Sequence, residues 1–331
     1  MISRILISAT LLSLVALFVG CATYFHSFDQ IPVEQSRWAM RRVQPSPDLD
    51  QLVTRCITDS VHEIGEGHVT TDTVWVTLID LRDPRYMRLG HYRGDEPVYP
   101  ASVIKVGYLM AVFHQVRNGM LPMSRAVKKD LKLMIGISDN EATNRLLDRL
   151  TATESGPELS REEFASFRYK RYTVDSYLKH LGLPGIFAIQ KTWSKAPFGR
   201  DIQLLGRYTG DHYQYSNKMT TNDTAKLLYL IAEEQVVDRR SCEKMLNLMQ
   251  RNPQRAKQRR VKRIAAGVPN SAKVWSKAGW TGLENHDAAI IELADGRRFI
   301  LVVFTLYKEK ETDIIQRITE KVVAALTSYS G

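Results

Sequence analysis

The sequence predicts an α/β protein in which one antiparallel sheet is built from both ends of the chain and an all-helical subdomain is inserted between its two halves. Two observations point to this layout: strand-like runs occur before residue 100 and after residue 270, and the long stretch between them reads mainly helical. Composition supports a large globular core, because 44% of the 331 residues are hydrophobic and 25% are charged. The 3 cysteines are too few for a small disulfide scaffold.

The first twenty residues have the composition of an export signal, with Arg4 followed by an apolar run from Ile5 to Gly20. This run is shorter than the roughly 20 apolar residues that cross a bilayer. It ends in Phe18-Val19-Gly20-Cys21, which resembles the bacterial lipoprotein box, where cleavage precedes a lipidated cysteine. We therefore expect residues 1–20 to be a lipoprotein signal peptide and Cys21 to carry the lipid. An uncleaved anchor and a plain secreted form are the alternatives.

Residues 21–50 show no sustained period and carry the Pro and Ser of a tether, so we expect the folded domain to occupy residues 51–331. In an oxidising compartment Cys56 and Cys242 could pair. Nothing in their spacing says that they meet, and two buried free thiols are the reading that we favour.

The first elements of the domain are a helix and two strands. Apolar residues recur every three or four positions from about residue 48, which predicts an amphipathic helix ended by Gly65. Apolar and β-branched residues then predict strands over 74–79 and 87–92.

The last elements complete the same sheet. Strands are predicted over 273–276, 288–293 and 299–306, with hairpin-turn chemistry at 294–297, and a helix is predicted over 313–326. The helical block is then an insertion. We expect functional groups where it leaves and re-enters the sheet, in a crevice between two subdomains.

One motif opens the helical block: Ser102 is followed three residues later by Lys105. On a helix these two side chains share one face. A serine needs a base to act as a nucleophile, and a lysine can serve if burial and nearby positive charge lower its pKa. The helix N-terminus also offers N–H groups to a developing oxyanion. Taken alone, an N-cap serine and a solvent lysine explain the motif as well.

A second motif, Ser138-Asp139-Asn140, lies between two helical patterns. A hydroxyl, a carboxylate and an amide in succession can relay a proton, fix the local backbone and bind a substrate amide. Another helix cap is the competing explanation.

A third motif, Lys277-Ala278-Gly279-Trp280, ends a predicted strand. The lysine can hold an anionic group, and the glycine lets a backbone edge approach a ligand. An edge-strand lysine followed by a turn glycine is the alternative.

Together, the three motifs in this order resemble the serine β-lactamase and penicillin-binding protein superfamily, most closely the class A β-lactamases, over roughly residues 50 to 331. The resemblance implies a β-lactamase-like three-layer fold and an acyl-enzyme mechanism without metal or cofactor. It also implies the roles of the site residues. Ser102 is the nucleophile, Lys105 accepts its proton, and Ser138 relays a proton to the leaving nitrogen. Asn140 binds the substrate's side-chain amide and Lys277 its carboxylate. Gly279 and Trp280 form the substrate-binding edge, where the backbone N–H groups of Ser102 and Trp280 form the oxyanion hole.

The departures from the family pattern bear on the reaction. Ala278 replaces the usual Thr or Ser, so a hydroxyl that helps to hold the carboxylate is missing. The interval from Ser102 to Ser138 is shorter than usual in class A, which predicts a wider site.

The family's deacylating Glu is also missing, since no Glu occurs between residues 164 and 232. Asp201 and Asp211 are the possible deacylation bases, and both are shorter than Glu by one methylene. A misplacement of about 1 Å can cost on the order of a hundredfold in rate. We therefore expect acylation to be intact and deacylation to be slow.

The leading function is β-lactam hydrolysis. The alternatives are a cell-wall D-alanyl-D-alanine peptidase-like amide hydrolase and a non-catalytic envelope binding protein. The expected partners are a small-molecule β-lactam or a cell-wall peptide, and a bacterial membrane contacted on its periplasmic side through the lipid anchor. We expect a monomer.

A basic run over residues 251–263, with seven positive residues of thirteen, could contact anionic lipid or cell-wall polymer. Export argues against nucleic acid as its partner. A solvated helix face is the simpler interpretation.

Overall fold

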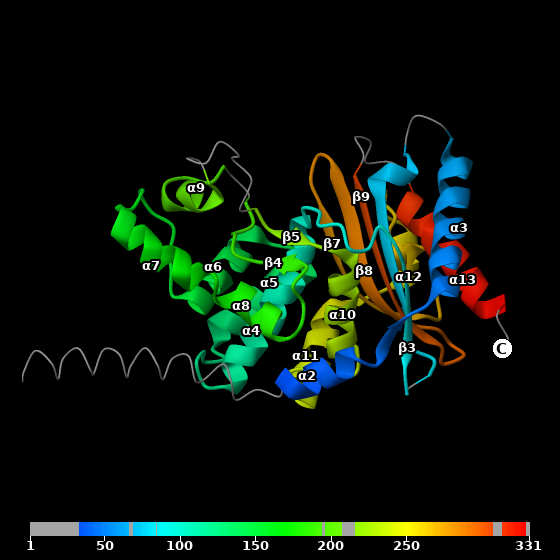
Figure 1. Ribbon diagram of the computed structural model, residues 1–331, viewed down its shortest axis with the longest axis horizontal. Helices are drawn as coiled ribbons and strands as arrows, with labels where there is room; N and C mark the ends of the chain where they lie inside the picture. Colours follow the sequence, from blue (N-terminus) through cyan, green and yellow to red (C-terminus); the bar gives the residue numbers. More distant parts are fainter. Residues whose placement is uncertain are drawn as a thin grey trace, which may run out of the picture.

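The computed structural model describes residues 33–65, 69–83, 85–193, 196–206, 216–306 and 313–328. A sheet stands between two layers of helices, with α3 and α13 on one face and the helical subdomain on the other (Figure 1). The predicted three-layer α/β architecture is confirmed.

The main sheet has seven strands in the order β1-β3-β2-β9-β8-β7-β6. Each neighbouring pair is antiparallel except β1 with β3, which are parallel. The pair β2–β9 joins the two ends of the chain, as the sequence predicts. The strands are β1 (Val43–Pro45), β2 (Val74–Asp80), β3 (Met87–Tyr92), β6 (Gln250–Arg251), β7 (Lys273–Trp280), β8 (Glu284–Glu292) and β9 (Arg298–Leu306), and a separate small sheet pairs β4 (Ile186–Phe187) with β5 (Lys218–Met219).

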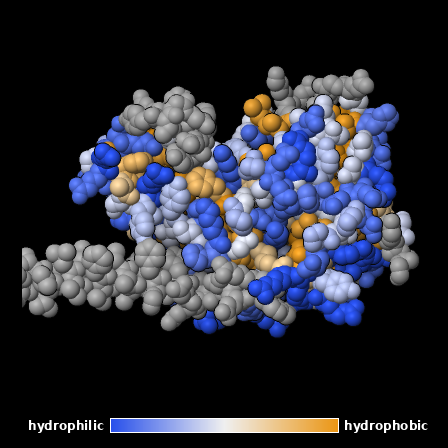
Figure 2. Space-filling view, viewed as in Figure 1, coloured by the Kyte–Doolittle hydropathy of each residue, from blue (hydrophilic) through white to orange (hydrophobic). Residues whose placement is uncertain are grey.

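The helices of the insertion lie between β3 and β7 in the chain, where the sequence predicts a helical block. The described helices are α2 (Val33–Met40), α3 (Pro47–Ile64), α4 (Lys105–Arg117), α5 (Arg125–Gly136), α6 (Asn140–Thr151), α7 (Arg161–Arg171), α8 (Thr173–His180), α9 (Arg200–Leu205), α10 (Thr221–Ala232), α11 (Arg239–Met249), α12 (Pro253–Lys257) and α13 (Ile314–Ser328), with 3₁₀ turns η1 (Thr71–Thr73), η2 (Ala101–Ile104) and η3 (Ile264–Ala266). None of them, within the described ranges, has the length and apolar content of a bilayer span. The face of the molecule in Figure 2 is mainly hydrophilic, with hydrophobic residues in scattered places.

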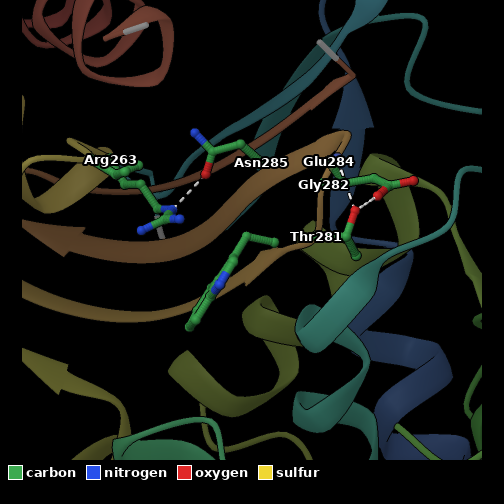
Figure 3. Close-up of a pocket in the computed structure, with 7 residues that line it drawn as sticks. Arg263, Thr281, Gly282, Glu284 and Asn285 are labelled. Atoms are coloured by element: carbon green, nitrogen blue, oxygen red, sulfur yellow. Dashed lines mark hydrogen bonds between the residues drawn. The ribbon is translucent and has the colours of Figure 1, made fainter. Parts of the chain in front are cut away.

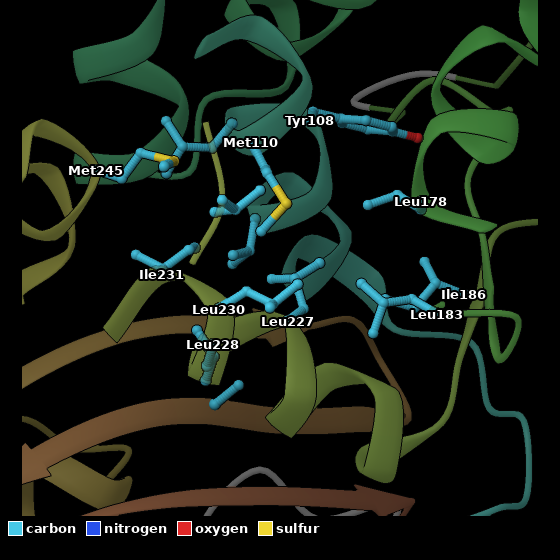
Figure 4. Packing of buried hydrophobic residues seen from close by; sticks show 14 of the residues in the cluster. Tyr108, Met110, Leu178, Leu183, Ile186, Leu227, Leu228, Leu230, Ile231 and Met245 are labelled. Atoms are coloured by element: carbon cyan, nitrogen blue, oxygen red, sulfur yellow. The ribbon is translucent and has the colours of Figure 1, made fainter. Parts of the chain in front are cut away.

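Strand alternation explains why both faces of the sheet are covered. Along β9, Phe299, Leu301 and Val303 pack into the core under α3 and α13, whereas Ile300 and Val302 pack into the core shared with the insertion. This second core includes buried side chains of α4 and α10, among them Met110, Leu227 and Leu230 (Figure 4). Because α4 follows directly after η2, this packing fixes the start of α4 against the sheet.

The N-terminal part of the described chain differs from the expected tether over residues 21–50. Residues 33–45 form α2 and β1, and β1 pairs with β3. Ala39 is fully buried, and the Ser36 hydroxyl donates to the Gln235 carbonyl at 2.7 Å. This segment is ordered by tertiary contacts, which a helix of eight residues and a strand of three cannot signal through sequence period.

The two cysteines of the described chain are free and buried, which confirms the favoured reading. They lie in different cores, Cys56 under α13 and Cys242 beside the insertion. Burial raises the pKa of Cys56 to about 11 and that of Cys242 to about 12, so both are unreactive thiols.

Candidate active site

The predicted nucleophile, Ser102, lies in η2, a 3₁₀ turn that runs directly into α4. The preceding Ala101 has φ 45°, a left-handed conformation that a non-glycine residue adopts only when its surroundings impose it. One such constraint is His286 on β8, whose Nε2–H donates to the Tyr99 carbonyl at 2.9 Å. The Thr305 N–H donates to His286 Nδ1 at 3.1 Å, which assigns the ring proton to Nε2. Burial lowers the pKa of His286 to about 4, so the ring is neutral.

Lys105, the first residue of α4, is fully buried. Its Nζ donates to the Ser138 carbonyl and to Asn140 Oδ1, both at 2.7 Å, and lies 3.3 Å from Ser138 Oγ. Burial lowers the pKa of Lys105 to about 7, while the nearby Asp139 carboxylate acts in the opposite direction. An amine with this pKa can accept a proton near neutral pH.

Ser138 lies in the link between α5 and α6 and has φ 63°. Asp139 caps α6 by accepting the Ala142 N–H at 2.6 Å, and its own N–H donates to the Leu133 carbonyl at 3.1 Å. These bonds hold a backbone conformation that costs roughly 1–3 kcal/mol. As a result, the Ser138 hydroxyl lies between the two lysines of the site.

Lys277, on β7, is the second of these lysines and is also buried. Its Nζ donates to Ser138 Oγ at 2.9 Å and to the Ala278 carbonyl at 2.6 Å. Burial holds the pKa of Lys277 well below its usual value, and the positive charges of Lys105, Arg251 and Arg263 lower it further, whereas Asp287 raises it. Four basic side chains thus lie near one another, and an anionic ligand among them would favour their charged forms.

Gly279 explains how closely β7 approaches Ser102, the predicted nucleophile. A Cβ at this position would lie 2.6 Å from the Pro100 carbonyl oxygen and 2.8 Å from the Ser102 nitrogen. No side chain fits there. The next residue, Trp280, is 50% exposed at the end of the strand, so the β7 edge and the backbone of η2 form one wall of the site.

Asn140, the first residue of α6, is held on both sides of its amide. Its Oδ1 accepts from Lys105, and its Nδ2 donates to the Trp193 carbonyl at 3.1 Å. The amide therefore links the buried lysine to the segment that precedes α9. The structure brings Lys105, Ser138, Asn140 and Lys277 into one hydrogen-bonded cluster, as the three motifs predict.

Of the two possible deacylation bases, the structure describes only Asp201. Asp201 is fully buried on α9, where its Oδ1 accepts from Arg171 Nη2 at 2.8 Å and its Oδ2 from the Ser155 hydroxyl at 2.5 Å. Its hydrogen bonds among the described residues are structural, and none joins it to the lysine–serine cluster. Asp211 lies outside the described residues. Within the same ranges, no group of three or more His, Cys, Asp or Glu side chains is arranged to hold a metal ion.

Residues 124–326 match a family model described as the beta-lactamase enzyme family. The chain belongs to the beta-lactamase enzyme family. It is a serine hydrolase of the β-lactamase type, within the superfamily that the three motifs indicate. No curated protein matches the chain in sequence.

Solved structures of this β-lactamase-type fold include several with TM-scores near 0.6. A PBP-A mutant in acyl-enzyme complex with penicillin G is 18% identical, with 86% of this chain and 98% of that chain covered and a TM-score of 0.61. A beta-lactamase from Sphaerobacter thermophilus is 19% identical over 85% and 98% of the two chains, with a TM-score of 0.60. A beta-lactamase from Chitinophaga pinensis is 22% identical over 84% and 99%, with a TM-score of 0.56. At these identities the likeness concerns the fold.

A small pocket adjoins the site of this β-lactamase family member at the tip of the β7–β8 hairpin (Figure 3). The guanidinium of Arg263 lies 5.2 Å from the centroid of the Trp280 ring, and its Nε donates to Asn285 Oδ1 at 2.7 Å. The pocket is lined by Val261, Arg263, Trp280, Thr281, Gly282, Glu284 and Asn285.

The basic run over residues 251–263 is only partly the helix face that we expect. Its helix, α12, spans five residues, and the cations in its middle are exposed. Its two ends turn inward: Arg263 reaches Trp280, and Arg251 donates to the Ile135 carbonyl at 2.9 Å.

Sequence reasoning missed His286 and Arg251. For His286, the available signal was a polar run, Asn285-His286-Asp287, directly before the apolar stretch that is predicted as a strand over 288–293. For Arg251 there was none, because its contact is with a residue far away in the sequence.

Proposed function

We propose that this β-lactamase family member opens β-lactam amides by acylating Ser102, and that the resulting acyl-enzyme is hydrolysed slowly. The observation that carries the proposal is the cluster in which Lys105, with its pKa near 7, contacts Ser138, and Ser138 in turn accepts from Lys277. A buried base, a relay hydroxyl and a cation for the substrate's carboxylate are the groups that acyl transfer from an anionic amide requires.

In the proposed reaction, Ser102 Oγ attacks the lactam carbonyl and its proton passes to Lys105. The N–H groups of Ser102 and Trp280 receive the developing oxyanion, and the closeness of Gly279 to the Ser102 nitrogen supports this arrangement. The C–N bond then breaks, and a proton passes through the Ser138 hydroxyl to the leaving nitrogen. Asn140 contacts the side-chain amide of the substrate, and Lys277 pairs with its carboxylate.

Slow deacylation follows from the missing carboxylate. The second step needs a base that activates water, and the buried Asp201 is already committed to Arg171 and Ser155. Asp211 remains a possible base. A persistent acyl-enzyme is equally the expected behaviour of a cell-wall D-alanyl-D-alanine peptidase-like amide hydrolase, which shares the acylation half of the reaction; the commitment of Asp201 is what favours this second candidate.

Time-resolved intact-mass spectrometry of the full, detergent-solubilised chain mixed with benzylpenicillin tests the proposal. We expect an adduct of the mass of the intact drug that forms within minutes, decays over hours and is absent in Ser102→Ala. Rapid turnover without an accumulating adduct would contradict slow deacylation. No adduct and no turnover would contradict β-lactam acylation itself and favour the non-catalytic binding protein.

We also propose that the protein is exported and anchored through a lipid on Cys21 to the periplasmic side of the bacterial envelope, and that it acts as a monomer. The export and the anchor are supported by the sequence of residues 1–21 alone, which lie outside the described residues. Cys21→Ser should release the protein from the membrane fraction, whereas Cys56→Ser should not. Light scattering after size exclusion tests the oligomeric state.

A further inference from the structure

Arg251 joins the edge of the main sheet to the helical subdomain. It ends β6, the edge strand, and its backbone pairs with Val274 on β7. Its side chain leaves the sheet: Nη2 donates to the Ile135 carbonyl at 2.9 Å, and Nη1 donates to the Gln250 carbonyl at 2.8 Å. One residue therefore contacts both elements that flank the site.

The two residues that Arg251 contacts on α5 and β7 precede Ser138 and Lys277 by the same number of positions in the sequence. Ile135, in the last turn of α5, comes three residues before Ser138, and Val274 comes three residues before Lys277. Ser138 Oγ and Lys277 Nζ are 2.9 Å apart. Arg251 thus bridges α5 and β7 just upstream of the point where their side chains meet.

The hydrogen bond to Ile135 also bears on the backbone conformation of Ser138. The carbonyl groups in the last turn of a helix lack partners within that helix, and a guanidinium donor can satisfy one of them. Ile135 is buried, so the Arg251 bond replaces water that cannot reach this carbonyl. The end of α5 is therefore fixed at the residues that lead into the left-handed Ser138.

We propose that Arg251 is a positioning residue of this active site, which holds the end of α5 against the β6–β7 edge and thereby sets the separation of Ser138 and Lys277. The inference rests on the proposed function, because its effect is measured as acylation of Ser102. It assigns Arg251 no contact with the substrate.

Three substitutions separate the hydrogen bond from the charge. Arg251→Met removes both, Arg251→Gln keeps a donor without charge, and Arg251→Lys keeps a charge without the planar guanidinium. Arg255→Met is the matched control, because Arg255 is an exposed cation of the same basic run. A misplacement of about 1 Å costs on the order of a hundredfold in rate. We expect the second-order rate constant for acylation by benzylpenicillin to fall at least about tenfold in Arg251→Met and Arg251→Lys, less in Arg251→Gln, and not in the control.

The pH dependence provides a readout that a merely structural role would not move. The charged groups that face Lys277 are Lys105, Arg251 and Arg263, which lower its pKa, and Asp287, which raises it. Removing the Arg251 charge raises the pKa of Lys277, so this lysine stays charged to higher pH. The descending limb of the acylation rate should therefore move to higher pH in Arg251→Met and Arg251→Gln, but not in Arg251→Lys.

The outcomes are distinguishable. If wild-type protein forms no adduct, the result contradicts the proposed function itself, on which the role of Arg251 rests. If wild-type protein is acylated and Arg251→Met, with a circular dichroism spectrum like that of wild type, reacts within about twofold of it, the inference is overturned. If Arg251→Met does not fold, Arg251→Lys decides: a wild-type acylation rate in this variant would show that the hydrogen-bonded bridge is dispensable.

Discussion

In the proposed mechanism, the reactivity of the site near neutral pH depends on the charge of one buried side chain, Lys105. Its three nearest oxygen partners, on Ser138 and Asn140, are uncharged acceptors, so they hold the amine in place without the full compensation that a carboxylate contact would give. The carboxylate of Asp139 is close enough only to offset part of the desolvation. The residue can therefore exist as a neutral base at pH values near 7.

This environment predicts the ascending limb of the pH profile. A proton acceptor must be unprotonated, so acylation should rise about tenfold per pH unit below the pKa of Lys105, near 7, and level off above it. Stopped-flow or quenched-mass kinetics from pH 5 to 8 measures this. Lys105→Arg, which stays protonated, should lose acylation at every pH. A flat profile would assign the proton to another group.

The close approach at Gly279 gives a second prediction at this scale. In Gly279→Ala the new methyl group meets backbone atoms of Pro100 and Ser102, which cannot move without displacing η2. We expect acylation to fall by about ten- to a hundredfold. Gly282→Ala is the control, because its Cβ would meet nothing within 4 Å. Equal acylation rates in the two variants would mean that the β7 edge does not set the position of the nucleophile.

At the scale of elements, the helices α7 and α9 are joined by a charge pair with no exposure. Arg171 and Asp201 are both 0% exposed, and their contact is 2.8 Å long. Such a pair gives little net stabilisation, yet removing one partner is costly because the other stays buried and charged. The pair thus holds α9 on the subdomain, and we expect the contacts of Asp201 with Arg171 and Ser155 to keep it from acting as the deacylation base.

Asp201→Asn should accordingly lower the free energy of unfolding by about 3–5 kcal/mol and leave the lifetime of the acyl-enzyme unchanged. Urea unfolding and the decay of the penicillin adduct measure the two effects. Asp295→Asn, at an exposed hairpin turn, is the control for loss of a carboxylate. A much longer-lived adduct in Asp201→Asn, at unchanged stability, would instead identify Asp201 as the base.

The elements differ in how far the sequence predicts them. Long strands such as β2 and β9 are predicted because both of their faces are buried, which leaves continuous apolar runs. The residues of the candidate site are predicted because each of the three motifs has several informative residues in a row. His286 and Arg251 act through backbone carbonyls of distant segments, and such contacts leave no periodic signal. The segment α2–β1 is too short for one.

At the scale of the whole molecule, the folded domain includes more residues than the sequence predicts. Residues 33–45 add a buried helix face and a parallel strand to the domain expected from residue 51. A full-length protein with Ala39→Glu, which places a charge at a fully buried position, should lose on the order of 2 kcal/mol of stability or more. Gln35→Glu, at an exposed position of the same helix, is the control. Equal unfolding midpoints would mean that this segment is a tether after all.

The central seam between β2 and β9 has a consequence for the order in which the molecule assembles. Its partners, such as Val74 and Thr305, come from opposite ends of the chain. Contacts between residues so far apart in sequence form slowly, because a long loop must close before they contribute. The sheet therefore cannot close until the residues of β9 have been synthesised, and until then β2 lacks one of its two neighbouring strands.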